Sequence, residues 1–302
     1  MSRFFLPIWW GHWLLIGVLR TLVLLPYSWL CPLGKIIGNA MYALMPARRA
    51  IALRNIRTCL SELSEQESIR LCRTHFQSLG IAVFEFALTW WATDWRLARI
   101  TKIKGIEHLQ RALEKRRGVI LLAAHFTPLE LSCRVLSQQL PIDCMYRPAD
   151  NPFFDALLRR GRERWAHKVI PRDDVRGMLR SLQDNDIVWY APDQGFAGRN
   201  AVIARFFGVP AWSNPATSRL VQASGAALLP FSFTRRTDGS GYDVEIGPPV
   251  ENFPGNDPIE DTERIHAIFE AQIRKAPEQY LWIHRRFKSL PAPNDDFYNE
   301  GR

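Results

Sequence analysis

From Ile100 onward, the chain alternates between short apolar runs and longer segments with helical periodicity. We expect strands at residues 100–104, 119–123, 143–146, 168–170, 187–191, 227–233 and 242–246. We expect helices at residues 106–115, 129–138, 152–165, 175–183, 215–224 and 258–275. Such alternation is typical of an α/β domain in which helices flank a largely parallel sheet. The sequence therefore predicts an α/β fold with a mostly parallel central sheet, formed by residues 100–290.

The N-terminal residues 1–30 are strongly apolar and are expected to anchor the chain to a membrane. Leu, Trp, Phe and Val dominate the segment, but His12, Arg20 and Pro26 interrupt it. A bilayer-spanning helix needs about 20 predominantly apolar residues, so a marginal transmembrane helix and an interfacial helix both remain open. The cationic residues after the segment outnumber the single Arg3 before it, which predicts that the rest of the chain is cytoplasmic. These cations are Lys35, Arg48, Arg49, Arg54 and Arg57.

Residues 31–99 have a helical pattern and are expected to form a membrane-proximal helical segment. Ser64 and Glu67 match a capping box, which predicts that a helix starts there. Trp90 and Trp91 are expected to end that helix and to pack in the core or against a membrane. At the other end of the chain, residues 291–302 are rich in Pro, Asn and Asp and are expected to be a loose tail.

The charge balance limits the classes of partner. Lys and Arg number 39 and Asp and Glu number 30, a net charge of +9 that favours nucleic acid, anionic lipid or an acidic carrier protein. Eleven Trp and the apolar N-terminus favour a membrane, because Trp gathers at bilayer interfaces. The five cysteines are scattered and include no C-x-x-C pair, so neither a disulfide framework nor a zinc site is indicated.

The stretch GVILLAAHFTPLEL, residues 118–131, joins a histidine and a carboxylate. On one helix, residues five apart point about 140° away from each other, so His125 and Glu130 would not share a face. A strand, a turn and a new helix would bring them together instead. Thr127 is an N-cap candidate and Pro128 fits the first helical position. A histidine and a carboxylate at such a turn suit a general base and the group that orients it.

Two other interpretations of this stretch stay open on the residues alone. Thr127 and Glu130 match the ends of a capping box, in which Glu130 would bond the N-cap amide. His125 would then be a structural histidine that follows an apolar strand.

Two further polar groups follow predicted strands. Arg147 and Asp193-Gln194 each follow a strand, and ligand sites in α/β sheets lie beyond the carboxyl ends of strands. The predicted helix at 152–165 is crowded with arginines, whose planar guanidinium groups suit phosphate or carboxylate oxygens. A solvated basic helix is the alternative, favoured for Arg159 and Arg160. Residues 206–210, FFGVP, are expected to form an apolar turn at the same sheet edge.

Seven segments in order resemble the bacterial lipid A late acyltransferases, the lauroyl/myristoyl transferase family of the lysophospholipid acyltransferase superfamily. They are the apolar N-terminus, RRAIALRNI, HFTPLE, YRPADNPFFD with RGRER, PRDDVRGMLRSL, VWYAPDQ and FFGVPA. The resemblance covers nearly the whole chain. It implies a glycerolipid acyltransferase-like α/β fold.

The resemblance also implies a reaction and its partners. A fatty acyl chain would pass from acyl carrier protein to the hydroxyl of a 3-hydroxyacyl chain on a Kdo-bearing lipid A precursor. His125 would be the general base, and Glu130 would orient and polarise its imidazole. The enzyme would contact inner-membrane lipids from the cytoplasmic face and would bind no nucleic acid. No metal or bound cofactor follows from the motifs.

The resemblance assigns substrate contacts as well. Around the acceptor headgroup or the reacting thioester it places Arg147, Asn151, Arg162, Arg164, Asp193, Gln194, Gly208 and Pro210. The chain departs from many relatives after Gln194, where Gly195 and Phe196 replace an acidic residue followed by Tyr-Gly. Three alternatives remain: an acyltransferase for another membrane lipid, a thioesterase that uses the same histidine, and a non-catalytic lipid-binding module.

Overall fold

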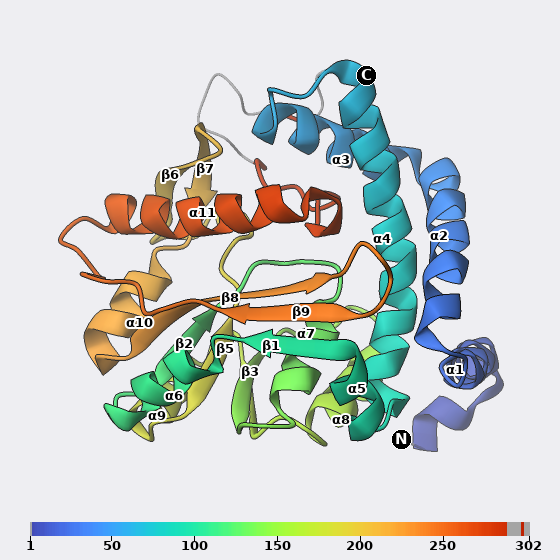
Figure 1. The fold of residues 1–302 in the computed structure, drawn as a ribbon, viewed down its shortest axis with the longest axis horizontal. Coiled ribbons are helices and arrows are strands. Elements are labelled where there is room, and N and C mark those ends of the chain that lie inside the picture. Colours follow the sequence, from blue (N-terminus) through green and yellow to red (C-terminus); the bar gives the residue numbers. More distant parts are fainter. Residues whose placement is uncertain (1, 289–296, 299–302) are drawn as a thin grey trace.

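A seven-stranded sheet forms the centre of the computed structural model, which describes residues 2–288 together with 297 and 298. Its strands, in spatial order, are β1 (Thr101–Lys104), β9 (Tyr242–Ile246), β8 (Ala227–Arg235), β2 (Val119–Leu122), β5 (Ile187–Tyr190), β3 (Ile142–Tyr146) and β4 (Lys168–Pro171). The β8–β9 pair is antiparallel, and the other neighbouring pairs are parallel (Figure 1). The predicted mostly parallel sheet, with its seven strands, is confirmed.

The helices expected between these strands are present. They are α6 (Ile106–Glu114), α7 (Leu129–Leu136), α8 (Pro152–Arg162), α9 (Val175–Gln183), α10 (Ala216–Ser224) and α11 (Pro258–Lys275). Local signals set their starts. Asp257, for example, caps α11 by accepting a hydrogen bond from the Ile259 amide at 2.7 Å, and Pro258 occupies the first helical position.

Strand β2 lies in the middle of the sheet and is buried on both faces. Successive side chains of a strand point to opposite faces. Ile120 therefore packs in a cluster with side chains of α9, α10 and α11, whereas Leu121 packs with side chains of α6 and α7. Helices on both faces thus hold the strand that leads to His125.

The N-terminal segment differs from the expectation of one apolar helix through residues 4–30. It forms η1 (Ser2–Phe5), η2 (Pro7–Trp9) and α1 (Trp10–Leu22), and α2 (Tyr27–Leu44) begins only after Pro26. Proline lacks a backbone N–H and disfavours a helix that continues through it; here η2 starts at Pro7 and α2 starts just after Pro26, whereas α2 itself continues through Pro32. Across residues 2–288, no helix is both long enough and apolar enough to cross a membrane.

Helices α3 (Pro46–Cys59), α4 (Glu65–Trp91) and α5 (Asp94–Ile100) complete the helical part. The capping box expected at the start of α4 is confirmed, because Ser64 N donates to Glu67 Oε2 at 2.8 Å and Ser64 Oγ accepts from Glu67 N at 3.4 Å. Helix α4 lies alongside α2 and stands across the side of the sheet (Figure 1). The two helices approach closely, since a Cβ on Gly80 would lie 2.1 Å from the Gly34 carbonyl oxygen. The close contact with α2 therefore fixes the position of α4 beside the sheet.

One hairpin was not expected. Strands β6 (Val202–Phe206) and β7 (Val209–Ser213) form a separate two-stranded sheet. Phe207 and Gly208, with φ of 50° and 73°, form the turn, so the expected turn is confirmed but its flanking strands were missed. The usual hairpin signal is Asn-Gly or Asp-Gly, and here an aromatic residue takes the first turn position.

Two residues of the C-terminal tail are described, and they are packed rather than loose. The Tyr298 hydroxyl donates to Asn55 Oδ1 at 2.6 Å and accepts from the Phe287 amide at 3.1 Å. The other residues after Leu290, and with them most of the tail expected to be loose, lie outside the described ranges.

Candidate active site

His125 follows strand β2 and Asp193 follows the adjacent strand β5, each the same number of residues beyond the end of its strand. The register of the parallel pair β2–β5 places Leu122 opposite Tyr190, and each polar residue follows three positions later. Asp193 Oδ2 accepts a hydrogen bond from the His125 amide at 3.1 Å, and Asp193 Oδ1 lies 2.5 Å from His125 Nδ1. The sheet therefore brings an imidazole and a carboxylate into contact at its carboxyl edge.

The environment sets the charges of this pair. Burial by itself lowers the pKa of His125, but the charge and hydrogen bond of Asp193, aided by the charge of Glu130, raise the pKa above its ordinary value. Burial raises the pKa of Asp193, and His125 outweighs this, so the pKa of the carboxyl is lowered. The His125 side chain is 23% exposed and that of Asp193 is 1% exposed. With Nδ1 held by an ionised carboxylate, Nε2 is the nitrogen available to accept a proton.

Glu130 lies on the first turn of α7 and contacts a different partner. Its carboxylate accepts two hydrogen bonds from Arg162 of α8, one of them from Nε to Oε2 at 3.1 Å and the other from Nη2 to Oε1. The Arg162 guanidinium also lies over the ring of Tyr146, at the carboxyl end of β3, 5.6 Å from its centroid. The carboxylate in contact with His125 is thus that of Asp193, and Glu130 acts on the imidazole through its charge. A catalytic function for Glu130 stays a prediction.

The capping-box interpretation of Glu130 is wrong. The N-cap position of α7 is Pro128, one residue later than expected, and it makes no side-chain cap. The Thr127 amide donates instead to the Gln279 carbonyl oxygen at 2.7 Å. The helix starts without Glu130, because this residue is turned towards Arg162.

A second chain segment fixes the loop that carries His125. Residues 279–281, at the end of η3 (Pro277–Gln279) and just after it, run antiparallel to residues 125–127, with Phe126 opposite Tyr280. The His125 carbonyl oxygen accepts a hydrogen bond from the Leu281 amide at 2.9 Å. The backbone of His125 is therefore held on both sides, by Asp193 and by Leu281.

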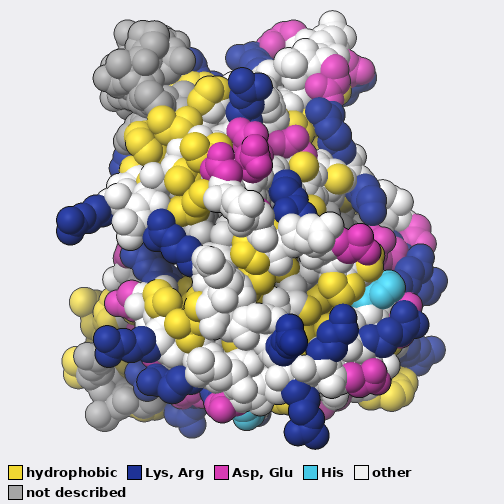
Figure 2. All heavy atoms as spheres, turned by 90° about the vertical axis from the view of Figure 1, so that its left-hand side faces the viewer, with side chains coloured by type: hydrophobic (Ala, Val, Ile, Leu, Met, Phe, Trp, Pro, Cys, Tyr) yellow, Lys and Arg dark blue, Asp and Glu magenta, His cyan; other side chains and the backbone are white. Residues whose placement is uncertain are grey.

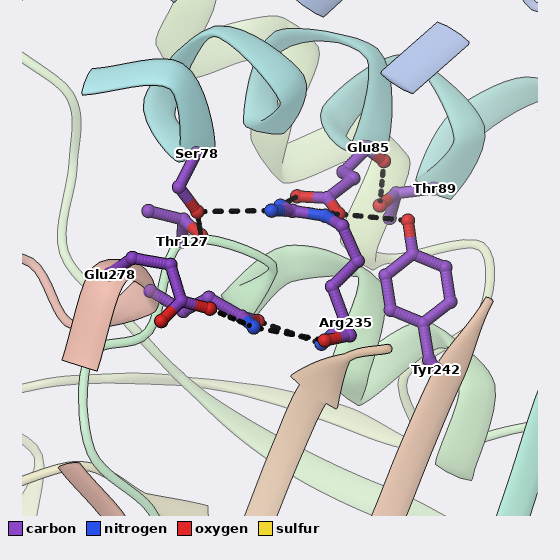
Figure 3. A network of polar contacts seen from close by, with 8 residues as sticks. Ser78, Glu85, Thr89, Thr127, Arg235, Tyr242 and Glu278 are labelled. Atoms are coloured by element: carbon purple, nitrogen blue, oxygen red, sulfur yellow. Dashed lines mark hydrogen bonds and ion pairs between the residues drawn. The ribbon is translucent and has the colours of Figure 1, made fainter. Parts of the chain in front are cut away.

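A buried polar network ties the same loop to α4 (Figure 3). Arg235, at the end of β8, donates to both carboxylate oxygens of Glu85 at 2.8 Å and to Ser78 Oγ at 3.0 Å. Ser78 Oγ in turn lies 2.8 Å from Thr127 Oγ1. The Tyr242 hydroxyl donates to Glu85 at 2.8 Å. Figure 3 shows these side chains bridging the sheet, α4 and the loop, so the network fixes Thr127 two residues from His125.

The enclosed side of His125 has little free space. A cavity of about 10 Å³ lies there, lined by Gln194, Tyr280, His284 and Arg286 as well as His125 and Asp193. This volume suffices for about one water molecule. Burial lowers the pKa of His284 to about 4, so His284 is neutral near pH 7. A substrate must therefore approach His125 from the exposed side of the imidazole.

The sequence comparisons give the family of the chain. A family model described as bacterial lipid A biosynthesis acyltransferase matches residues 2–289. The chain belongs to this family. The family suggested by the seven motifs is thereby confirmed.

Three relatives of this acyltransferase come from Escherichia coli (strain K12). It is 38% identical over 286 residues to the lipid A biosynthesis lauroyltransferase, covering 94% of each chain. It is 37% identical over 302 residues to the lipid A biosynthesis palmitoleoyltransferase, covering 98% of this chain and 97% of the relative. It is 22% identical over 285 residues to the lipid A biosynthesis myristoyltransferase, covering 94% and 88%. The names of the relatives share lipid A biosynthesis and differ in the acyl chain.

The other residues predicted to contact substrate are dispersed in the acyltransferase. Gln194 lines the small cavity beside His125. Arg147 is 65% exposed, and its Nη2 lies 3.9 Å from Asp150 Oδ1. Asn151 caps α8, since its Oδ1 accepts from the Phe153 amide at 2.9 Å. Substrate contacts of these residues stay predictions.

The remaining predicted residues lie further along the chain. Arg164 follows α8 and lines a larger cavity between α8 and the end of α4. Gly208 and Pro210 are exposed, at the turn and the start of β7 in the small hairpin. Sequence reasoning missed Asn55 of α3, which donates to the carbonyl oxygens of Trp282 at 2.7 Å and His284 at 2.8 Å. Its place in the quoted RRAIALRNI segment was the available signal.

One group of possible metal ligands lies at the opposite, amino-terminal edge of the sheet. Within the described residues, ligand atoms of Asp143, His167 and Asp186 lie within 4.8 Å of one another. The Lys168 ammonium group contacts Asp186 at 2.7 Å and neutralises part of the charge. This group is an ion-pair cluster separate from His125.

Proposed function

We propose that this lipid A acyltransferase transfers a fatty acyl chain from acyl carrier protein to a Kdo-bearing lipid A precursor. The acceptor is the hydroxyl of a 3-hydroxyacyl chain, and the product is an acyloxyacyl group. Membership of the lipid A acyltransferase family supports the reaction class. The observation that carries the assignment of residues is the contact between Asp193 and His125 Nδ1, which leaves Nε2 free to accept a proton on a side chain that is 23% exposed.

In the proposed reaction, His125 Nε2 takes the proton of the acceptor hydroxyl as its oxygen attacks the thioester carbonyl carbon. The new C–O bond forms, the C–S bond breaks, and the imidazolium returns the proton to the departing thiolate. Asp193 and Glu130 stabilise the imidazolium by their negative charges. A positioned base of this kind contributes about 100- to 10,000-fold to the rate.

A cysteine nucleophile is not required by this scheme. Cys59 lines the cavity beside His125, but burial raises the pKa of its thiol far above the ordinary value. The nucleophilic form of cysteine is the thiolate. Direct attack by the acceptor hydroxyl is the simpler reaction for these residues.

The proposal places the enzyme on the cytoplasmic face of the inner membrane. The N-terminal elements expose large apolar side chains, among them Leu6, Ile8, Trp10, Leu14 and Leu24, each at least 58% exposed. Exposed apolar surfaces rimmed by polar residues mark protein or membrane contacts, and Trp is favoured at bilayer interfaces. Anchoring by a short interfacial helix fits these side chains and the 13-residue length of α1.

Acyl carrier protein is acidic and would meet a basic surface on the enzyme. On the face drawn in Figure 2, lysines and arginines are spread among acidic side chains. The formal net charge of +9 suits such an acidic partner.

Product analysis tests the proposal. The full-length protein, purified in detergent, is incubated with an acyl carrier protein thioester and a Kdo-bearing lipid A precursor, and lipid masses are recorded. We expect the precursor to gain the mass of one acyl chain. Release of free fatty acid with no change in the precursor, or transfer only to phospholipid, would contradict the proposed acceptor.

A further inference from the structure

A second, much larger cavity lies between the N-terminal elements, the end of α4 and helix α8. Its volume is about 500 Å³, within the range of about 300–1,000 Å³ that is usual for ligand pockets. Trp13, Trp90 and Leu157 supply apolar walls. Gly161 leaves room for the Trp90 ring, because a Cβ there would lie 2.6 Å from Trp90 Nε1. Trp90 of α4 and Gly161 of α8 thus form part of the same cavity wall.

Basic side chains line the same cavity. Arg134 of α7 lines it and is already paired with Asp94. Arg160 and Arg164 line it four residues apart and are exposed, and neither forms an ion pair with any residue in the described ranges. Arg159, in contrast, pairs with Glu163 at 2.7 Å outside the cavity. Two guanidinium groups beside an aromatic pocket suit a phosphate attached to an apolar chain.

The cavity adjoins the residues around His125. Arg134 lies one helical turn after Glu130 on α7, and Gly161 and Arg164 flank Arg162 on α8 and the turn after it. The Glu130–Arg162 ion pair joins these two helices, and the charge of Glu130 reaches His125. A lipid with one chain in the cavity would therefore lie close to the candidate base.

The lining of the cavity includes one of the exposed apolar side chains of the N-terminal elements. Phe5, which is 65% exposed, lines the cavity, and Leu6 and Ile8 next to it are also exposed. A lipid held in a bilayer against this surface would reach the cavity without crossing water.

We propose that this cavity binds one acyl chain of the acceptor lipid, while Arg160 and Arg164 contact a phosphate of its headgroup. The inference rests on the proposed function, because it takes the acceptor to be an anionic, multi-chain lipid. The acyl chain of the donor reaches His125 separately, through its thioester.

Steady-state kinetics distinguish acceptor from donor. The Arg160→Gln/Arg164→Gln variant of the full-length enzyme is expected to raise KM for the lipid A precursor about tenfold or more, because it loses charge-assisted hydrogen bonds. Its kcat and its KM for the acyl carrier protein thioester are expected to change less than about twofold. Arg159→Gln, on the same helix but outside the cavity, is the matched control and is expected to match wild type. A change confined to the donor KM, or no change in either KM, overturns the inference.

Equilibrium binding tests the cavity without turnover. Radiolabelled lipid A precursor in detergent is bound to the protein with donor withheld, and Leu157→Trp is used to fill the apolar part. We expect Leu157→Trp to bind the precursor at least about tenfold more weakly, because the larger side chain would occupy the space proposed for the acyl chain. Its Tm and circular dichroism are recorded to check that it folds. If that variant does not fold, the arginine variant is measured in the same assay.

Competition identifies the source of the lipid. Dioleoyl phosphatidylglycerol at the same concentration is expected not to displace the precursor, and equal displacement overturns the assignment to the acceptor. Failure of the inference is separable from failure of the proposed function. If wild type acylates the precursor while the cavity variants bind it normally, only the inference fails; if wild type does not acylate the precursor, the function fails.

Discussion

The 2.5 Å contact between His125 Nδ1 and Asp193 Oδ1 follows from the register of two neighbouring strands. Each residue lies three positions beyond a residue of the Leu122–Tyr190 pair. Parallel strands in register carry their following loops to the same sheet edge. The contact between the candidate base and the carboxylate beside it therefore depends on the register of the sheet.

Asp193→Asn is predicted to lower activity and to change its pH dependence. Because Asp193 raises the pKa of His125, wild-type kcat/KM should rise with pH through a pKa above the ordinary histidine value. The variant loses this charge while burial still lowers the pKa of His125, so its rising limb should move to lower pH. Its plateau should fall by about 100-fold or more. Profiles of kcat/KM against pH, across the range in which histidine titrates, check this prediction. A rising limb of the variant that lies at the same pH as in wild type, or at a higher pH, would be inconsistent with it.

The Glu130–Arg162 pair is predicted to couple α7 to α8. Both side chains are at most 20% exposed, and removing one partner leaves the charge of the other largely buried without its ion-pair partner. A double-mutant cycle with Glu130→Gln and Arg162→Gln should give a coupling free energy of about 1–3 kcal/mol. Urea unfolding of the four proteins measures it, with Arg159→Gln as a surface control. Strict additivity would show that the pair contributes nothing to stability.

Ser78→Ala is predicted to loosen the loop that carries His125. The change leaves Arg235 Nη1 and Thr127 Oγ1 without a buried partner, which should lower the free energy of unfolding by about 1–3 kcal/mol. Thr74→Ala, on the exposed side of α4, should stay within about 0.5 kcal/mol of wild type. Thermal unfolding compares them. Faster amide exchange at residues 125–127 is expected in Ser78→Ala alone, and its absence would argue that the network does not hold the loop.

Gly80→Ala is predicted to force α4 away from α2. The added Cβ would lie 2.1 Å from the Gly34 carbonyl oxygen, so the variant should be less stable by about 1–3 kcal/mol. Gly17→Ala in α1, whose Cβ would meet nothing within 4 Å, should instead be neutral or stabilised by up to about 1 kcal/mol. Chemical denaturation of both variants tests the contrast. Equal effects of the two substitutions on stability would mean that the close contact between α4 and α2 does not require glycine at position 80.

Periodicity and caps predicted most of the α/β domain. The strand expected at residues 119–123 and the helix expected to start at Pro258 are both confirmed. The hairpin turn at Phe207-Gly208 lacks the usual turn residues, and its strands were missed. In the N-terminal segment, Pro26 was recognised as an interruption, but the division at Pro7 was not expected.

The candidate site was predicted only in part, because its contacts join distant residues. His125 and Asp193 were expected at one sheet edge, but strand order decides that β2 and β5 are neighbours. Glu130 was expected to orient the imidazole, from a strand–turn–helix geometry and from the family resemblance, whereas in the structure its carboxylate pairs with Arg162 of α8. The antiparallel contact of residues 279–281 with the loop had no sequence signal.

Single-turnover acyl transfer by His125→Ala tests the central claim, that His125 is the base for acylation of a lipid A precursor. Full-length His125→Ala and wild type are mixed with an acyl carrier protein thioester and the precursor, and the acylated product is followed by mass spectrometry. His108→Ala, on α6, is the matched control. We predict a rate lower by about 100- to 10,000-fold for His125→Ala, with unchanged circular dichroism and a wild-type rate for His108→Ala. A rate for folded His125→Ala within a few-fold of wild type would contradict the claim.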